Sequence, residues 1–313
     1  MTTHESPAEV RLLNETLMSQ LESRDPHQQK TANDALNTFT RTTVREEGFY
    51  RNIIPMLPIT PNDLTPQVDT DKPVRLEERE PNSPGSASIP FGTLPDNLYL
   101  YGDKYLVHFD RIVTRRFTKD VAELGTYRMD LRQVISDNAI KDIHSHEDQR
   151  FMRSVDNILL SPGQTNPTSG VSQYQEISGG ITRDSFSDSL AIMPSTPSNL
   201  EVKTVLMNQL TVKQLMKWGR DELGGDMSQK IVQDGWTSKR LMGVDLVVTI
   251  KKGLVATNKM YHFADPRYIG KSYEFEKTTM YVKREAFMLE FFMYEMLGGT
   301  IGWTSGVSAA KFV

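Results

Sequence analysis

Proline spacing is the feature that most restricts how this chain can fold. Nine prolines fall between Ile53 and Pro95, with few apolar residues among them. Proline fixes φ and lacks a backbone N–H, so such a run excludes a long helix and a central strand. A stretch of this length without its own core usually lies against other structure. We therefore expect an extended arm, resting on the rest of the chain or on a neighbouring copy.

Helical patterns stand on both sides of this arm. Ser6-Pro7-Ala8-Glu9 is a capping box with proline at the first helical position, and Asp25-Pro26 begins a second helix that is predicted to end near Glu47. Residues 130–160 keep apolar side chains at helical spacing throughout. The sequence thus predicts two short helices before the arm and one long helix after it.

Strand patterns occupy most of the remaining chain. Residues 97–117 alternate on both sides of Gly102-Asp103-Lys104, which predicts a hairpin with its turn at those three residues. Residues 244–266 predict two strands joined by a turn at Lys252-Gly253, and residues 278–297 predict strand or mixed strand and helix. The fold class expected from these patterns is α+β.

Two further segments complete the pass along the chain. Residues 161–198 are rich in Pro, Gly, Ser and Thr and predict a loop with little regular structure. Residues 211–223 predict a helix that stops at Gly224-Gly225.

Composition excludes several function classes. The chain has no cysteine, so disulfides, thiolate metal sites and a cysteine nucleophile are absent. Its net charge of -4 does not suit a protein that mainly coats nucleic acid. The first residues resemble no secretory signal, and the most apolar window, residues 287–303, is interrupted by two glutamates and two glycines. No membrane segment is therefore predicted.

Gly270-Lys271-Ser272 raises the alternative of a nucleotide-binding enzyme. A phosphate-binding loop needs an earlier glycine five positions before the second one, and that position is Asp265. The following residues also predict a strand where the motif requires a helix. The motif is therefore a weak match, and no Gly-x-Ser-x-Gly nucleophile motif accompanies it.

The remaining polar clusters have ordinary interpretations. His144, His146 and Glu147 lie on the long helix with Asp148, where residues two apart cannot share an ion, so a solvated helix face is expected. We predict no catalytic, cofactor-binding or metal-binding residues.

Basic residues gather beside the predicted hairpin. Arg111, Arg115, Arg116 and Lys119 are expected to be solvated, to bridge subunits, or to contact packaged nucleic acid. For a bridge, complementary charges are available in the arm at Glu77, Glu78 and Glu80.

Aromatic residues near the C-terminus predict a packed core and a subunit interface, because no convergent polar set accompanies them. They are Tyr273, Phe275, Tyr281, Phe287, Phe291, Phe292, Tyr294 and Trp303.

This order of elements resembles the major capsid proteins of tailed bacteriophages. Segments similar to that family include "REEGFYRNIIPMLPIT", "VDTDKPVRLEEREPNSPG", "FGTLPDN", "FDRIVTRRFTKDVAEL", "DLRQVISDNAIKDI" and "MLGGTIGWTSGVSAAKF". The resemblance covers roughly Thr40 to Val313 and is weakest over residues 161–198.

The resemblance implies the Hong Kong 97-type capsid fold. Residues 1–70 would form the N-terminal arm with helices, and residues 71–129 the extended segment and the E-loop hairpin, itself near 97–118. Residues 130–200 would form the spine helix and a peripheral-domain loop. Residues 201–313 would form the axial domain and the return strands of the peripheral domain.

The implied function is a self-assembling, non-catalytic shell around the double-stranded DNA of a phage head, assembled in the host cytoplasm and located in the virion. Implied partners are further copies in pentamers and hexamers, scaffolding, portal and decoration or cement proteins, and DNA by weak non-specific contact. Some family members cross-link subunits through lysine and asparagine, which draws attention to Lys104. A bacterial encapsulin-type compartment shell has the same fold and is the structural alternative.

Overall fold

The structure is a computed structural model that describes residues 48–66, 71–79, 88–94, 102–120, 122, 131–167, 169–215, 240–251 and 253–313. The two helices predicted before residue 48 lie outside these ranges, as do residues 216–223 of the helix predicted over 211–223. The described elements, in chain order, are α3 (Phe49–Ile53), β1 (Met56–Pro58), η1 (Pro61–Asp63), β2 (Val74–Glu78), β3 (Lys104–Val113), β4 (Phe117–Asp120), α5 (Leu131–Leu159), β5 (Tyr174–Ile177), α6 (Arg183–Ala191), β6 (Thr204–Asn208), α7 (Gln209–Leu215), β7 (Arg240–Leu241), β8 (Val244–Thr249), β9 (Lys259–Phe263), η2 (Pro266–Tyr268), β10 (Gly270–Glu285), β11 (Met288–Ile301), η3 (Thr304–Gly306) and β12 (Val307–Phe312).

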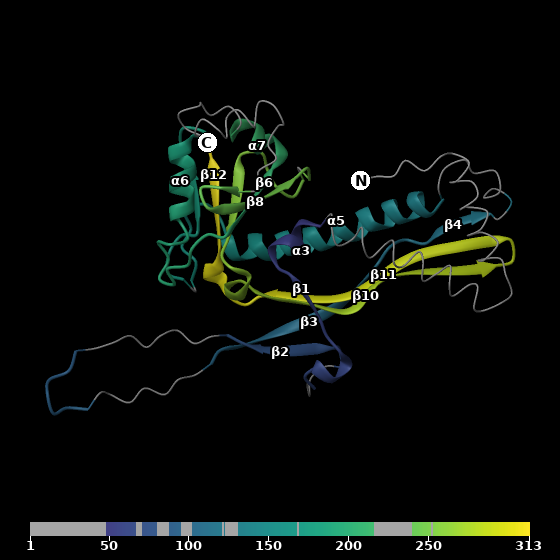
Figure 1. The fold of residues 1–313 in the computed structure, drawn as a ribbon, viewed down its shortest axis with the longest axis horizontal. Helices are drawn as coiled ribbons and strands as arrows, with labels where there is room; N and C mark the ends of the chain where they lie inside the picture. Colours follow the sequence, from purple (N-terminus) through teal and green to yellow (C-terminus); the bar gives the residue numbers. More distant parts are fainter. Residues whose placement is uncertain are drawn as a thin grey trace.

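The strands form two sheets of six strands each. The first has the order β1-β10-β11-β3-β2, with β4 paired to β11, and the second has the order β5-β12-β9-β6-β8-β7. Helix α5 spans the middle of the molecule between them, and the long β10–β11 hairpin extends away from the second sheet (Figure 1). The described chain therefore has two sheet units joined by one helix.

Helix α5 connects the sheets because its buried stripe changes partner along its length. Ala139, Ile140 and Ile143 pack with the buried residues of β11 in the core of the first sheet. Phe151 and Val155 pack with α3 and with the second sheet. All lie at the three- and four-residue spacing that keeps side chains on one helix face. The long helix predicted over 130–160 is confirmed.

The predicted hairpin turn at Gly102-Asp103-Lys104 is wrong. Lys104 begins β3, where it lies opposite Glu78 of β2, and Arg79 N donates to Asp103 O at 2.7 Å. The ladder therefore continues through these residues, and the strand before β3 is Val74–Glu78. Leu98 and Leu100, which suggested the other arm of the hairpin, lie outside the described residues.

Two other local predictions are corrected, and a third is confirmed in one of its alternatives. Residues 161–198 contain a strand, β5, and a helix, α6, whose N-cap Thr182 accepts from Ser185 N. Strands β8 and β9 exist as predicted but do not pair with each other, since both pair with β6. For residues 278–297 the strand alternative is confirmed, since all but the turn at Ala286 and Phe287 lie in β10 or β11.

Candidate functional site

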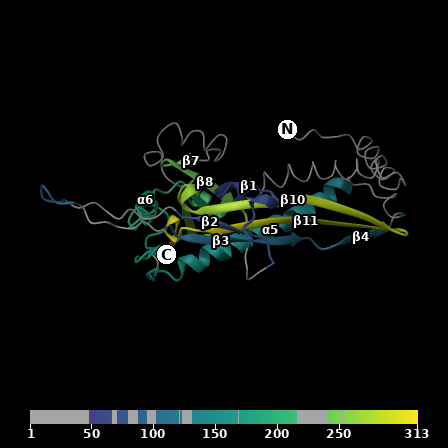
Figure 2. The same cartoon turned by 90° about the horizontal axis from the view of Figure 1, so that it is seen from below.

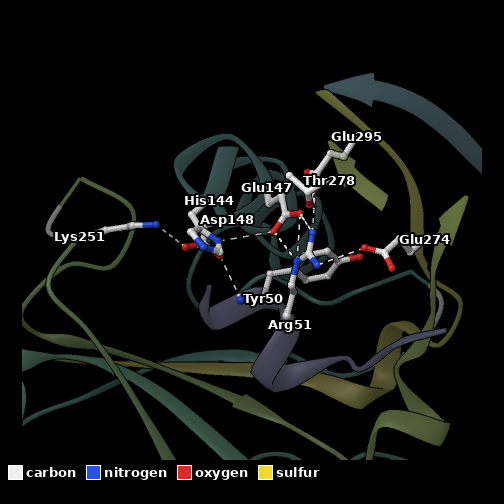
Figure 3. A network of polar contacts seen from close by, with 9 residues as sticks. All are labelled: Tyr50, Arg51, His144, Glu147, Asp148, Lys251, Glu274, Thr278 and Glu295. Carbon is white, nitrogen blue, oxygen red and sulfur yellow. Dashed lines mark hydrogen bonds and ion pairs between the residues drawn. The ribbon is translucent and has the colours of Figure 1, made fainter. Parts of the chain in front are cut away.

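A buried charge network holds α3 against α5 and the first sheet (Figure 3). The Arg51 guanidinium donates from Nη2 to Glu147 Oε1 at 2.6 Å and from Nε to Glu147 Oε2 at 3.1 Å. The same Nη2 lies 2.9 Å from Glu295 Oε2, and Nη1 lies 3.5 Å from Glu274 Oε1. One arginine thus joins helix α3, at the start of the predicted arm, to the long helix and to the β10–β11 hairpin.

Glu147 and Glu295 lie against the same guanidinium, and their pKa values are shifted in opposite directions. Burial alone would raise the pKa of Glu147, but the hydrogen bonds and charge of Arg51 outweigh it and lower that pKa. Burial and the nearby charge of Glu147 raise the pKa of Glu295 to about 9. Protonated Glu295 can therefore hydrogen bond to Glu147 at neutral pH, while Thr278 Oγ1 donates to its Oε2 at 2.9 Å.

This proton makes stability depend on pH in a defined window. Glu295 stays protonated in the folded state up to about pH 9, whereas it ionises near pH 4.5 in the unfolded chain. Between pH 7 and 9 the folded state holds one more proton, so its free energy of unfolding should fall by about 1.4 kcal/mol per pH unit from this group. The variant Glu295→Gln should remove that slope and be more stable than the wild type at pH 9. Thermal unfolding of both proteins across this range measures the slopes, and identical slopes would contradict the protonation of buried Glu295.

The predicted solvated face at His144 to Asp148 is wrong for three of its four residues. His144, Glu147 and Asp148 are buried, and only His146 is exposed. Asp148 Oδ1 accepts from Tyr50 N at 3.0 Å, and its Oδ2 accepts from Lys251 Nζ at 2.6 Å. Burial lowers the pKa of His144 to about 4, so this ring is neutral near pH 7. The middle of the buried face of α5 is therefore polar, and its carboxylates contact α3 and Lys251, which follows β8.

Gly270-Lys271-Ser272 lies inside β10 and offers no phosphate cradle. Ser272 pairs with Met56 of β1 on one side and with Gly299 of β11 on the other, so its strand is flanked on both edges. Lys271 Nζ lies 2.7 Å from Glu77 Oε2 of β2. A P-loop instead turns backbone N–H groups toward phosphates at the start of a helix.

Gly270 is required by close packing of strands. A Cβ at this position would lie 2.2 Å from Thr300 O, which is a backbone atom that cannot rotate away. Gly270→Ala is expected to lower the free energy of unfolding by about 3 kcal/mol through overpacking. Gly253→Ala is the matched control, because nothing lies within 4 Å of that Cβ. Chemical denaturation of both variants measures the difference, and equal stabilities would contradict the packing argument.

The base of the segment between β2 and β3 is fixed by a second polar cluster. Glu77 accepts from Lys271 and from the Tyr273 hydroxyl, and from Arg75 Nε at 2.6 Å. Burial raises the pKa of Glu77, but the hydrogen bonds from these three side chains outweigh it and lower that pKa. Arg79 lies 5.4 Å from the centre of the Trp303 ring.

The far end of this segment is apolar and exposed. Residues 88–94 lie apart from both sheets, at the left edge of Figure 1. Phe91 has a relative exposure of 109% and Leu94 of 92%. Exposed large apolar side chains in one place usually mark a contact surface.

Two of the four predicted basic residues pair within their own chain. Arg111 Nη2 lies 3.2 Å from Glu276 Oε2, and Arg116 Nη1 lies 3.8 Å from Glu290 Oε2. Glu78 pairs with Lys104 at 3.2 Å, so the arm carboxylates and the hairpin arginines are not joined within the described chain. Glu80 lies outside the described residues.

The aromatic residues near the C-terminus divide into core and surface. Tyr273 and Phe291 are buried, whereas Tyr281 and Phe287 are exposed on the β10–β11 hairpin. Across the ranges that the structure covers, no group of His, Asp and Glu is arranged to hold a metal ion. In the same ranges, no helix combines the length and apolarity needed to cross a membrane.

Comparisons with known proteins find similar architectures among solved structures. No protein-family model and no curated protein sequence matches the chain. Among solved structures it is similar to the bacteriophage PhiM1 mature capsid, with TM-score 0.58 and 10% identity over 85% of this chain and 87% of that one. It is also similar to the capsid of an empty GTA particle, with TM-score 0.58 and 11% identity over 84% and 89%. A virus-like particle from Pyrococcus furiosus matches with TM-score 0.54 and 12% identity over 88% and 98%. The chain has the Hong Kong 97-like fold that the sequence led us to expect.

Proposed function

We propose that this chain is a major capsid protein, which self-assembles into the icosahedral head shell that encloses the double-stranded DNA of a tailed phage. The observation that carries the proposal is the exposed apolar tip at residues 88–94 on a molecule with the fold of phage capsids. An isolated subunit leaves this surface in water, and a neighbouring copy would cover it.

The two sheet units suit a closed shell. A projection on one copy and a receiving surface on the next make a heterologous contact, which closes into rings when the rotation fits. Rings of five and six would share the same contacts. The arm, E-loop, peripheral and axial divisions over 1–70, 71–129, 130–200 and 201–313 remain a prediction, as do scaffolding, portal, decoration and DNA partners and assembly in the host cytoplasm.

The role we propose is structural and non-catalytic. The buried polar groups of the described chain pair mainly with one another, as Arg51, Glu147 and Glu295 do. Such a network holds segments together, and its carboxyls are closed to a substrate because they are buried. Gly270, Lys271 and Ser272, which raised the alternative of a nucleotide-binding enzyme, pair as part of β10 with β11.

A compartment shell of encapsulin type is the second candidate. It is favoured by the match to the Pyrococcus furiosus virus-like particle, which includes 98% of that chain. The two candidates differ in contents, since one shell holds a genome and the other holds protein.

Electron microscopy of the purified protein, with size-exclusion chromatography, tests the proposal. Uniform shells, or discrete pentamers and hexamers, are the expected result. A protein that stays monomeric across salt concentrations and with crowding agents would overturn the shell function. Shells isolated from the natural source that contain a folded enzyme and no DNA would favour the compartment.

A further inference from the structure

A small cavity opens beside the buried charge network. It lies between α3, α5 and β11, where helix α5 runs alongside β11 (Figure 2). Its volume is about 20 Å³, which is room for about one water molecule. The polar side chains that line it are Tyr50, Glu147, Arg150, Ser154 and Thr300. Ser154 is exposed, so this side chain stands where the cavity meets solvent.

Glu147 can accept one more hydrogen bond at this cavity. Its Oε1 accepts from Arg51 Nε at 3.2 Å and from Arg51 Nη2 at 2.6 Å, whereas its Oε2 accepts only from Arg51 Nε, at 3.1 Å. A carboxylate oxygen has two lone pairs, so one lone pair of Oε2 is left over. His144 does not use it, because its Nδ1 lies 3.9 Å away and has no hydrogen-bond partner in the described chain. The buried carboxylate therefore has room for a further donor.

The charges at the cavity favour a neutral ligand. Arg150 lines it and pairs with Asp110 at 2.8 Å, so a cation in the cavity would be repelled by a guanidinium. An anion would be repelled by buried Glu147. Water can donate to Glu147 and accept from Arg150 or from the Ser154 hydroxyl, which gives it the two or more polar partners that a buried water needs.

We propose that this cavity binds one ordered water molecule, and that this water is the route by which Glu147 and Glu295 exchange protons with solvent while the subunit stays folded. Both residues are 1% exposed, and Arg51 Nη2 lies 2.6 Å from one carboxylate and 2.9 Å from the other. Glu147 lines the cavity and Glu295 does not, so the path from Glu295 runs through Glu147. In each exchange the O–H proton of Glu295 moves to Glu147 and on to the water, and a proton from solvent returns by the same path. The charge of the two carboxyl groups is unchanged.

The water route determines how quickly the subunit responds to a change of pH. A buried group without such a route exchanges only when the structure around it opens, as slow backbone amides do. With the water in place, Glu295 can gain or lose its proton without separating α3 from α5. The inference concerns the single subunit and does not depend on the proposed shell function.

Infrared spectroscopy of the full chain at pH 7 tests this inference. The C=O band of a protonated carboxyl shifts when deuterium replaces the proton, and Glu295→Gln identifies the band of Glu295 by its loss. After transfer to heavy water, this band should shift at least roughly tenfold faster than the slowest backbone amides of β11 exchange. A band that shifts only together with those amides would overturn the inference, because exchange would then require opening. Absence of the band from the wild type would overturn it as well.

Two serine variants on the same helix give a matched comparison. Ser154→Leu places an apolar side chain over the cavity and should slow the shift of the band roughly tenfold or more. Ser145→Leu changes another exposed serine of α5, which lies outside this cavity, and should leave the rate unchanged. Leucine is a good helix former, so both variants should fold. Equal rates in the two variants would contradict a route through the cavity.

A high-resolution experimental structure of the wild type gives a readout that requires no variant. Density for a water molecule within hydrogen-bond distance of Glu147 is the expected result. A dry cavity would overturn the inference, whether or not Ser154→Leu folds.

Discussion

Replacing Arg51 with methionine is expected to lower the free energy of unfolding of the subunit by about 3 to 5 kcal/mol, because it leaves the buried, ionised Glu147 without its counter-charge. Glu147 and Glu295 are each 1% exposed, so water cannot take over the role of the guanidinium. For a chain of this size we expect the melting temperature to fall by about 10 °C. The loss should be smaller at low pH, where Glu147 takes up a proton. Thermal unfolding of dissociated subunits at pH 5 and pH 8 measures both effects.

Two further variants test whether the lost ion pairs cause the destabilisation of Arg51→Met. Arg111→Met breaks an ion pair in which the side chains are 52% and 36% exposed, and it should cost less than about 1 kcal/mol. The double variant Arg51→Met, Glu147→Met removes both partners of the main pair and should be less damaged than Arg51→Met alone. If Arg51→Met were no worse than Arg111→Met, the network would not be what holds α3 in place.

The elements that could be predicted from the sequence are those with a long periodic pattern of apolar residues. Helix α5 and the β10–β11 strands carry repeats long enough to identify without knowledge of their partners. The partner of β3 was missed because strand pairing is set by tertiary packing, and residues 79–103 separate β2 from β3 in the sequence. Helix α6 was missed because Ser and Thr dominate its surroundings, although Thr182 and Ser185 form a readable capping box.

The charge network was also missed, yet its sequence carried a signal. Met293, Glu295 and Leu297 have the same parity in β11, which places the glutamate on the buried face. A carboxylate among buried apolar neighbours requires a partner, and Arg51 stands between the apolar residues Tyr50 and Ile53. Which arginine meets which glutamate follows only from the packing of α3 on α5, since 244 positions separate the two residues.

Replacing both Phe91 and Leu94 with serine is expected to abolish shell assembly while leaving the subunit folded. Both side chains are almost fully exposed, so the free energy of unfolding should change by less than about 0.5 kcal/mol. In a shell, the same residues would be buried against a neighbour, and each lost side chain would cost about 1.5 to 3 kcal/mol per contact. Because every copy in a closed ring repeats that loss, assembly should fail sharply. Electron microscopy and size-exclusion chromatography measure the yield of shells, and thermal unfolding checks the subunit.

The conservative change Phe91→Leu separates apolar burial from a requirement for the aromatic ring. It keeps an apolar side chain at the tip, so it should retain shells and differ from the double serine variant mainly in how easily the shells dissociate. Shells formed equally well by the double serine variant would show that the tip makes no contact that assembly needs. Assembly would then have to rest on other exposed apolar side chains, of which Phe287 on the β10–β11 hairpin is the next most exposed aromatic. The same pair of substitutions at that hairpin, Phe287→Ser and Phe287→Leu, would locate the contact.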